Sequence, residues 1–386
     1  MITLGVDIGS LTGKAVVLRD GAILAQEVIL TGPDSVETGQ QVTDNALAAA
    51  GLTLQDMDFT VSTGYGRIVI PFADKNVSEI SCHARGASHL FSRARTILDM
   101  GGQDCKAIRC DEAGKVTDFA MNDKCAAGAG RSMGIVSELL KVPLPELGPL
   151  SLQAKERDGD GVPVSSTCVV FARSEIVGYL RNGVPRSEIL AGSCAALCSR
   201  VQALLRRVGL EDDFVISGGI AKNPGVVRRL EQRLGLQAHI AEEPQIVGAL
   251  GAALFARDLL EKRAAKAARR EQRDARPRRS RRPRRPTPAK REGGAKRANY
   301  GDADGSGEYY LTIDTDRCDG CEKCVDACPQ GVLEVVEDDW DDLKAQVKPE
   351  LQRRLADVCW GYHARCNNEP DSCQAACPHD AISHSW

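Results

Sequence analysis

The sequence predicts an α/β domain, an arginine-rich connecting segment and a small cysteine-rich α+β domain, in that order. Short apolar segments alternate with helical patterns over the first 256 residues, which is typical of α/β folds. Arginine and proline dominate the segment that follows, and eight cysteines at regular spacing lie between residues 318 and 377. These observations divide the 386 residues into two folded domains and a linker.

The distribution of charge supports the same division. Residues 1–256 carry 25 Lys and Arg against 29 Asp and Glu, a net charge of −4. Residues 257–298 carry 18 against 5, or +13, and residues 299–386 carry 7 against 19, or −12. We therefore expect a first domain at 1–256, a basic linker at 257–298 and an acidic domain at 299–386.

Apolar runs predict the strands of the first domain, and longer mixed runs predict its helices. The strand candidates are Ile2–Ile8, Ala15–Leu18, Phe59–Thr63, Thr96–Met100 and Phe214–Ser217. We expect helices at Val201–Val208 and at Gly248–Ala256, the latter with a charged helical continuation over Arg257–Asp274. In the last domain, Tyr309–Asp314 predicts a strand that leads into the cysteine cluster.

Composition argues against several protein classes. No run approaches eighteen consecutive apolar residues, so we expect no membrane-spanning helix. The N-terminus has neither a basic region nor a cleavage site, so it does not have the features of a signal peptide. Fifteen cysteines without a secretion signal favour metal binding over disulfides. Together these features predict a cytoplasmic protein.

The run at residues 276–291 is rich in arginine and proline and contains no aromatic residue. Such a segment cannot bury enough apolar surface to offset the entropy lost on ordering. We interpret it as an extended linker, although a basic run could also bind nucleic acid or an anionic membrane. The interleaved prolines favour the linker, so nucleic acid is not an expected partner.

The eight cysteines have the pattern of a two-cluster ferredoxin. The first four follow the spacing Cys-x2-Cys-x2-Cys-x3-Cys-Pro, in which the fourth cysteine ligates the other cluster. The prediction is two [4Fe–4S] clusters. One is held by Cys318, Cys321, Cys324 and Cys377, and the other by Cys359, Cys366, Cys373 and Cys328.

The second set of cysteines departs from the usual spacing, because six residues replace two on either side of Cys366. A zinc module is the alternative, since Cys-x2-Cys pairs also build zinc ribbons. Two Cys-Pro endings and eight cysteines favour iron–sulfur clusters. The acidic surface expected here suits docking to a basic redox partner.

Three glycine-containing loops in the first domain suggest a phosphate site. The first spans Asp7–Lys14, where small residues let backbone amides approach phosphate and Gly9, Ser10, Thr12 and Lys14 supply contacts. It is not a Walker A loop, because Gly9 stands one residue too close to Gly13-Lys14. Alone, this loop could equally be a plain β-hairpin.

The other two loops follow strand candidates. Asp99 precedes Gly101, Gly102 and Gln103, and a later turn contains Gly218, Gly219 and Asn223. This set resembles the actin, sugar-kinase and heat-shock ATPase superfold, whose two ribonuclease-H-like lobes bind ATP or ADP in a cleft. The resemblance implies that Asp7 and Asp99 hold Mg²⁺, directly or through water, and that Gln103 orients the attacking water.

Two further cysteines, Cys125 and Cys168, each stand just before a predicted helix. A helix N-terminus favours a thiolate and suits metal ligation, although a lone cysteine is more often a small buried apolar residue. Cys194 and Cys198 share one helix face and, with the three cysteines at 82, 105 and 110, are expected to be core or partly exposed thiols. No ligand role is assigned to His83.

Six motifs within residues 1–256 carry a family resemblance: TGYGR at 63–67, SEISCHARGA at 78–87, LDMGGQD at 98–104, NDKCAAGAGR at 122–131, SSTCVVFARSE at 165–175 and ISGGIAKNPGVV at 216–227. They resemble the 2-hydroxyacyl-CoA dehydratase activators and the ATPase subunits of benzoyl-CoA reductase. The resemblance implies one [4Fe–4S] cluster that bridges two subunits, with Cys125 and Cys168 from each. It also implies a homodimer, or a heterodimer with a related ATPase subunit.

The function expected from this resemblance is ATP-driven electron transfer to an acyl-CoA reductase or dehydratase component. The linker and ferredoxin tail are additions to the family, and we expect the tail to supply electrons to the bridging cluster. An external ferredoxin or flavodoxin could also act as donor. Two alternatives are a small-molecule kinase of the same superfold and a redox-sensing regulatory ATPase.

Overall fold

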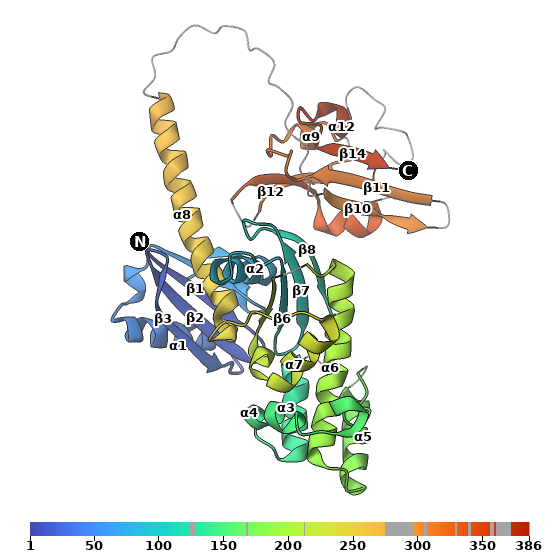
Figure 1. Cartoon of the computed structure of the whole chain (residues 1–386). Coiled ribbons are helices and arrows are strands. Elements are labelled where there is room, and N and C mark those ends of the chain that lie inside the picture. The colour runs from blue at the N-terminus through green and yellow to red at the C-terminus, as the bar shows by residue number, and fades with distance from the viewer. Residues whose placement is uncertain are drawn as a thin grey trace. The chain divides into compact units, whose positions relative to one another are not determined.

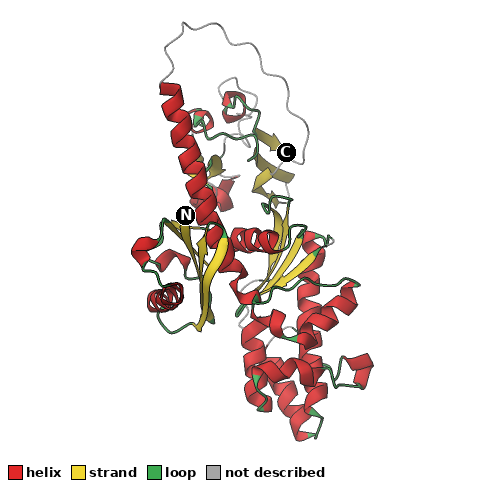
Figure 2. Cartoon of the chain, turned by 60° about the vertical axis from the view of Figure 1, so that its left-hand side comes forward, coloured by secondary structure: helices red, strands yellow, loops and turns green. Residues whose placement is uncertain are grey.

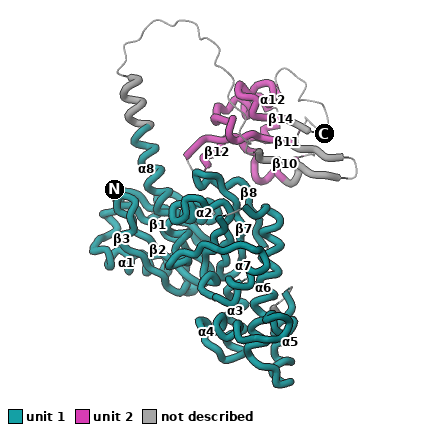
Figure 3. Tube along the Cα trace, in the orientation of Figure 1, with its two compact units in different colours: residues 1–266 teal, residues 267–386 magenta. Residues whose placement is uncertain are grey.

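The chain forms two compact units, Met1–Lys266 and Ala267–Trp386 (Figure 3). The computed structural model describes residues 1–122, 129–166, 169–211, 213–274, 297–304, 307–328, 330–338, 341–355, 359 and 372–385. The first unit contains two sheets with their helices, and the second contains the cysteine-rich domain.

The first sheet of unit 1 has the strand order β3-β2-β1-β4-β5. β1 (Ile2–Ile8), β2 (Thr12–Arg19) and β3 (Ala22–Leu30) form an antiparallel meander, and β4 (Phe59–Thr63) pairs with β1 in parallel. The short β5 (Lys75–Asn76) continues the parallel edge. Helix α1 (Ser35–Ala50) is capped by Asp34, whose carboxylate accepts from the Val36 N–H, and packs against β2 and β3.

The second sheet repeats this order as β8-β7-β6-β9. β6 (Thr96–Met100), β7 (Cys105–Cys110) and β8 (Val116–Met121) form the antiparallel meander, and β9 (Phe214–Ser217) pairs with β6 in parallel. Val215 of β9 also makes a parallel bridge to His239. His239 therefore lies beside β9 in the place that β5 has beside β4 in the first sheet. The two halves of unit 1 therefore share one topology.

Two helices lie between the sheets (Figures 1 and 2), namely α2 (Glu79–Leu90) and α8 (Val247–Asp274). Glycines allow their close packing: a Cβ on Gly5 of β1 would lie 2.0 Å from the Ala249 carbonyl oxygen, and one on Gly86 would lie 2.1 Å from that of Val247. The α8 face that meets the first sheet is apolar and buried through Ala249 to Leu254.

A group of helices packs against the second sheet. It contains α3 (Ala129–Leu140), α4 (Leu144–Ser151), α5 (Val169–Arg181), α6 (Arg186–Val208) and α7 (Pro224–Leu234), and it shares one apolar core with β6, β7 and β9. Within the described residues, only α6 is long and apolar enough to cross a membrane, and 67% of its most apolar stretch is buried in this core. Short 3₁₀ turns connect these elements at Leu54–Asp56, Arg67–Val69, Glu156–Gly159, Gly219–Lys222 and Pro244–Ile246.

Unit 2 is built around a three-stranded sheet of order β10-β11-β14, formed by Arg297–Asp304, Gly307–Asp314 and Ile382–Ser385. Its described part also contains a hairpin of β12 (Leu333–Glu337) and β13 (Leu343–Val347), a 3₁₀ turn at Pro349–Arg354 and two one-turn helices. The helices α9 (Lys323–Asp326) and α12 (Cys373–Ala376) carry Cys324 and Cys373 into its small core.

The predicted elements are confirmed. Four strands have the expected bounds, Ala15–Leu18 lies within β2, and Val201–Val208 is the last part of α6. Gly248–Ala256 and Arg257–Asp274 form one continuous helix, α8. The predicted linker run at 276–291 lies outside the described residues.

Candidate functional site

A cavity of about 460 Å³ opens where the two halves of unit 1 meet. Residues from β1, β2, β6, β7 and the loops after β9 line it. The structure brings together here every residue that the sequence suggested for nucleotide and magnesium: Asp7, Gly9, Ser10, Thr12, Lys14, Asp99, Gly101, Gly102, Gln103, Gly218, Gly219 and Asn223. This volume lies in the range of small-molecule sites.

Asp7 and Lys14 face each other across the β1–β2 hairpin. They are register partners, and Lys14 Nζ lies 3.2 Å from Asp7 Oδ2 with both side chains largely buried. The Gly9 N–H donates to the Thr12 carbonyl at 3.0 Å, which closes the turn between them. The hairpin alternative and the phosphate-loop interpretation are thus compatible, because the turn of this hairpin lines the cavity.

Asp99 lies at the end of β6 among three partners. Ser217 Oγ donates to its Oδ1 at 3.3 Å, His83 Nε2 lies 3.6 Å from Oδ2, and Lys106 Nζ lies 3.5 Å from the same oxygen. Burial alone would raise the pKa of Asp99, but the charges of His83, Lys106 and Lys14 outweigh it and hold the pKa below its usual value. Asp99 is therefore a carboxylate, the form that binds Mg²⁺.

Sequence reasoning missed three buried polar residues of this site: His83, Lys106 and Ser217. His83 Nδ1 lies 3.2 Å from Ser217 Oγ, so the two form a chain that ends on Asp99. One signal was available for Lys106, because a lysine inside the buried strand Cys105–Cys110 requires a buried anion. Its spacing from Asp99 equals that of Lys14 from Asp7.

Two glycines bring the backbone close to the carboxylates. Gly64 and Gly218 both have φ of +84°, and a Cβ would lie 2.3 Å from Asp7 Oδ1 at the first and 2.7 Å from Asp99 Oδ1 at the second. The positive φ and the short distance to the added Cβ exclude a larger residue at Gly64 and at Gly218. The backbone therefore passes directly beside each carboxylate, and both carboxylates line the cavity.

The Gly218-Gly219 loop leads into α7 through Asn223. The Asn223 side chain caps this helix by accepting from the N–H groups of Gly225 at 2.9 Å and Val226 at 3.2 Å. Lys222 pairs with Glu243 at 2.7 Å on the same rim. The predicted contact of Asn223 with a nucleotide would thus come from a side chain whose carbonyl already serves as a helix cap.

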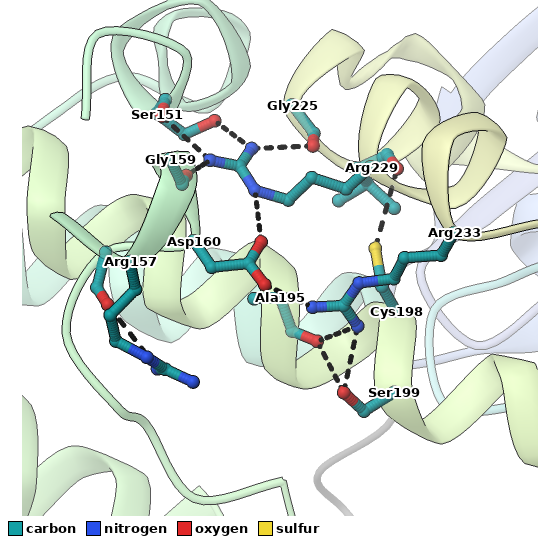
Figure 4. A network of polar contacts seen from close by, with 12 residues as sticks. Ser151, Arg157, Gly159, Asp160, Ala195, Cys198, Ser199, Gly225, Arg229 and Arg233 are labelled. Atoms are coloured by element: carbon teal, nitrogen blue, oxygen red, sulfur yellow. Dashed lines mark hydrogen bonds and ion pairs between the residues drawn. The ribbon is translucent and has the colours of Figure 1, made fainter. Parts of the chain in front are cut away.

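A polar network holds α7 against α4 and α6 (Figure 4). Arg229 donates to the Ser151 carbonyl at 3.0 Å, to the Gly225 carbonyl at 2.8 Å and to the Gly159 carbonyl, and it pairs with Asp160 at 3.4 Å. Arg233 reaches the same carboxylate at 2.8 Å. The network fixes the base of the loop that lines the cavity.

The residues fit a magnesium nucleotide. A Cβ on Gly9 would lie 3.1 Å from Lys14 Nζ, and one on Gly101 would lie 3.3 Å from Asp104 Oδ1, so these glycines leave room that side chains would fill. Two lysines and several backbone N–H groups can meet phosphate, and the carboxylates of Asp7 and Asp99 can meet the cation.

The loop at Gly101 is also joined to α3. The Gly130 N–H donates to the Gly101 carbonyl at 3.0 Å, and the Arg131 N–H donates to the Gly102 carbonyl at 2.8 Å. The predicted cluster ligands Cys125 and Cys168 lie outside the described residues. The helix after Cys168 does begin at Val169, as expected, and Arg200 donates to the Ser166 carbonyl at 3.0 Å just ahead of it.

In unit 2, the four cysteines predicted for the first cluster line one pocket: Cys318, Cys321, Cys324 and Cys377. The backbone N–H of Ala345 donates to Cys318 Sγ at 3.2 Å, and that of Ala381 donates to Cys377 Sγ at 3.3 Å. Such donors stabilise thiolate ligands, so the site fits a cluster. Burial and the neighbouring cysteines raise the pKa of the Cys324 thiol to about 11.

Three of the four cysteines predicted for the second cluster are described. Cys359 and Cys373 are buried in the core of unit 2, and Cys328 packs against that core. Cys366 lies outside the described residues. Nowhere in the described part of the chain do three His, Cys, Asp or Glu side chains gather closely enough to enclose a single metal ion.

The other described cysteines have structural positions in unit 1. Those at 82, 105, 110, 194 and 198 are buried, as predicted. Burial raises the pKa of Cys105 and of Cys198 to about 12. No disulfide is present among the cysteines that the structure describes.

Comparison with known proteins agrees with this division. The sequence profile of the BadF/BadG/BcrA/BcrD ATPase family matches residues 4–256, and that of the 4Fe-4S binding domain matches residues 311–334. The activator of lactoyl-CoA dehydratase from Anaerotignum propionicum is 47% identical over 264 residues, which cover 68% of this chain and 100% of the relative. One of the benzoyl-CoA reductase subunits from Thauera aromatica is 31% identical over 274 residues, covering 68% of this chain and 95% of the relative.

Solved structures give the same result. Component A of the Acidaminococcus fermentans (R)-2-hydroxyglutaryl-CoA dehydratase is 40% identical with a TM-score of 0.63, covering 66% of this chain and 97% of that one. The 2-hydroxyisocaproyl-CoA dehydratase activator from Clostridium difficile, solved with bound ADPNP, is 37% identical with a TM-score of 0.63, covering 72% of this chain and 100% of that one. The chain therefore belongs to the BadF/BadG/BcrA/BcrD ATPase family and carries a 4Fe-4S binding domain behind its ATPase unit.

Proposed function

We propose that this chain uses ATP hydrolysis to drive single electrons to a CoA-thioester dehydratase or reductase component. The observation that supports this is the presence, in one chain, of an ATPase-family unit with a carboxylate- and lysine-lined cavity and of a 4Fe-4S binding domain. The names of its relatives supply the class of acceptor. A small-molecule kinase would not account for the second unit, and ATP hydrolysis coupled to electron transfer would exclude a redox-sensing regulatory ATPase.

The cavity supplies the groups that phosphoryl transfer requires. Asp7 and Asp99 would hold the Mg²⁺ of Mg-ATP, directly or through water, and Gln103 would orient the attacking water. The glycines of the Gly9, Gly101 and Gly218 loops admit the nucleotide to the backbone. Hydrolysis then consumes one water and releases ADP and phosphate, and catalysis rests mainly on positioning and on charge.

Cys125 and Cys168, with the same two residues of a second subunit, would hold the bridging [4Fe–4S] cluster. When bound, such a cluster supplies a one-electron carrier. Four thiolates require two chains, so the working form is a homodimer or a heterodimer with a related ATPase subunit. The hydrogen bonds from Gly130 and Arg131 to the Gly101 loop connect the nucleotide site to the helix that follows Cys125.

Unit 2 would be the built-in electron donor, with residues 257–298 as its linker and 299–386 as a two-cluster ferredoxin domain. Its ligands would be the two predicted sets of four cysteines. Tethering raises the concentration of the donor near its acceptor without any new contact. An external ferredoxin or flavodoxin would reduce unit 2, and the cytoplasm supplies both the donor and ATP.

The central test is anaerobic. The purified chain is reduced, mixed with a 2-hydroxyacyl-CoA dehydratase component or a benzoyl-CoA reductase component, and supplied with Mg-ATP. We expect the acceptor to be reduced only when ATP is hydrolysed, with the imido analogue of ATP giving no reduction. Hydrolysis without any electron transfer to either component would refute the proposal.

A second test isolates the tail. Removing residues 299–386 leaves a unit whose relatives are matched over 95–100% of their length, so it should fold by itself. We expect slower reduction by an external donor and an unchanged rate of ATP hydrolysis. Equal reduction rates with and without the tail would remove its role as donor and leave the ATPase proposal standing.

A further inference from the structure

The two halves of unit 1 present the same set of groups to the cavity. Asp7 pairs in register with Lys14 across one hairpin, and Asp99 pairs in register with Lys106 across the other. Each lysine follows its aspartate by seven residues. The turns also correspond, because Gly9 N–H donates to the Thr12 carbonyl and Gly101 N–H donates to the Asp104 carbonyl, each at 3.0 Å.

The correspondence extends to the neighbouring strands. Asp7 is the register partner of Thr63, which precedes Gly64, and Asp99 is the register partner of Ser217, which precedes Gly218. Both glycines have the same φ, and each lies against Oδ1 of its aspartate. Lys106 is thus the counterpart of Lys14 in position, partner and backbone setting.

The surroundings of Lys106 are unusually charged for a buried side chain. Its Nζ lies 2.7 Å from Asp104, 3.5 Å from Asp99 and 3.6 Å from Glu79, and only 5% of the side chain is exposed. Three carboxylates therefore surround this ammonium group at ion-pair distance.

A buried lysine with a purely structural role needs only one carboxylate to balance its charge. Lys106 has three carboxylate neighbours and also lines the cavity. Two of those neighbours, Asp99 and Asp104, flank the loop that holds Gln103. The ammonium group therefore lies beside the loop that carries Gln103, the residue proposed to orient the attacking water. A cation there would meet the charge of the outermost phosphate.

We propose that Lys106 is a second phosphate-binding lysine, which acts from the second half of the unit on the terminal phosphate of ATP while Lys14 acts from the first half. This inference rests on the proposed function, because it assigns a residue to the ATP site. It predicts discrimination between ATP and ADP, since only ATP carries the phosphate that Lys106 would contact.

The test measures binding of Mg-ADP and of the Mg-bound imido analogue of ATP to the full-length chain by anaerobic calorimetry. We expect Lys106→Met to weaken binding of the ATP analogue by at least about tenfold. Its affinity for ADP should stay within about threefold of wild type. Lys106→Arg, which keeps the charge, should recover most of the affinity, and Lys155→Met, outside the cavity, should match wild type.

Several results would overturn the inference. Equal losses for ADP and the ATP analogue would show that Lys106 only maintains the fold, and an unchanged affinity for the analogue would show that it does not touch phosphate. Should Lys106→Met fail to fold, Lys106→Gln carries the same expectation. A wild-type chain that binds neither nucleotide would instead refute the proposed function itself.

Discussion

Gly251 of α8 lies directly against the backbone of Cys82 in α2, and a Cβ at this position would be 1.8 Å from the Cys82 carbonyl oxygen. The two helices carry buried residues that pack on different sheets of unit 1. This contact therefore sets how closely the two halves approach, and with it the width of the cavity that they share.

Gly251→Ala should lower the stability of the ATPase unit. The methyl group meets backbone, which cannot move aside as a side chain can, so we expect a loss of about 2 kcal/mol or more in the free energy of unfolding. Gly134→Ala in α3 is the matched control, because nothing lies within 4 Å of its added Cβ. That change should be neutral or stabilising by about 0.5 kcal/mol or more. Urea unfolding followed by circular dichroism measures both, and equal effects would contradict the packing argument.

Asp99→Asn should abolish most of the ATP hydrolysis. The change removes a carboxylate that the neighbouring cations keep ionised, and under the proposed function it weakens the binding of Mg²⁺. We expect the hydrolysis rate to fall roughly 100-fold or more. Phosphate release under anaerobic conditions gives the measurement, with the exposed Asp44→Asn of α1 as control. A rate within about threefold of wild type would mean that Asp99 does not take part.

Arg229→Met should be far more damaging than Arg233→Met, although both arginines pair with Asp160 (Figure 4). Only 6% of the Arg229 side chain is exposed, against 24% for Arg233, and three backbone carbonyls accept from Arg229. Its removal takes one buried donor away from each of those carbonyls and leaves Asp160 with a single cationic partner. We expect a loss of about 3 kcal/mol in unfolding free energy for Arg229→Met and about 1 kcal/mol for Arg233→Met. If the two variants lost equal free energies of unfolding, the stabilisation would come from the ion pairs with Asp160 and not from the carbonyls that accept from Arg229.

Much of this organisation could be predicted from sequence because local signals were strong. Apolar runs marked β1, β4, β6 and β9 to the residue, and glycines beside aspartates marked the loops that line the cavity. Each of these signals depends on residues close together in the chain, such as the seven-residue step from Asp7 to Lys14.

The parts that escaped prediction depend on contacts between distant segments. His83 reaches Asp99 from α2, and Ser217 reaches it from β9, across separations that no periodicity reveals. Lys106 is a different case, since its spacing from Asp99 repeats that of Lys14 from Asp7, although the strand that buries it was not among those predicted. The repeat becomes evident only when both hairpins are seen in the same register.

Cys105 and Cys198 should resist alkylation in the native protein. Their pKa values of about 12 leave roughly one thiol in ten thousand ionised at pH 8, and only the thiolate reacts. Iodoacetamide at pH 8, followed by mass spectrometry, should therefore label them only after unfolding in urea. The unfolded thiols ionise at about pH 8.5, whereas the folded thiols stay protonated up to about pH 12. The contribution of these thiols to stability is therefore fully present below about pH 8.5 and is lost as the pH rises toward 12. Rapid labelling without urea would contradict their placement in the core.

Cys321→Ser should remove iron from unit 2. Cys321 is the exposed member of the four cysteines that line one pocket, and a serine hydroxyl is a poor substitute for a thiolate ligand of iron. We expect a loss of up to about four iron atoms per chain, with a matching loss of acid-labile sulfide and of the visible absorption of one cluster.

Cys110→Ala is the control, because that buried thiol lies in unit 1 and donates to the Ala94 carbonyl rather than lining the pocket. Its iron content should equal that of wild type. Cys377→Ser should reproduce the loss seen for Cys321→Ser, since both cysteines line the same pocket although they are 56 positions apart in the sequence. Full iron content in both serine variants would refute this ligand set, whereas loss in Cys321→Ser alone would show that Cys377 is not a required ligand.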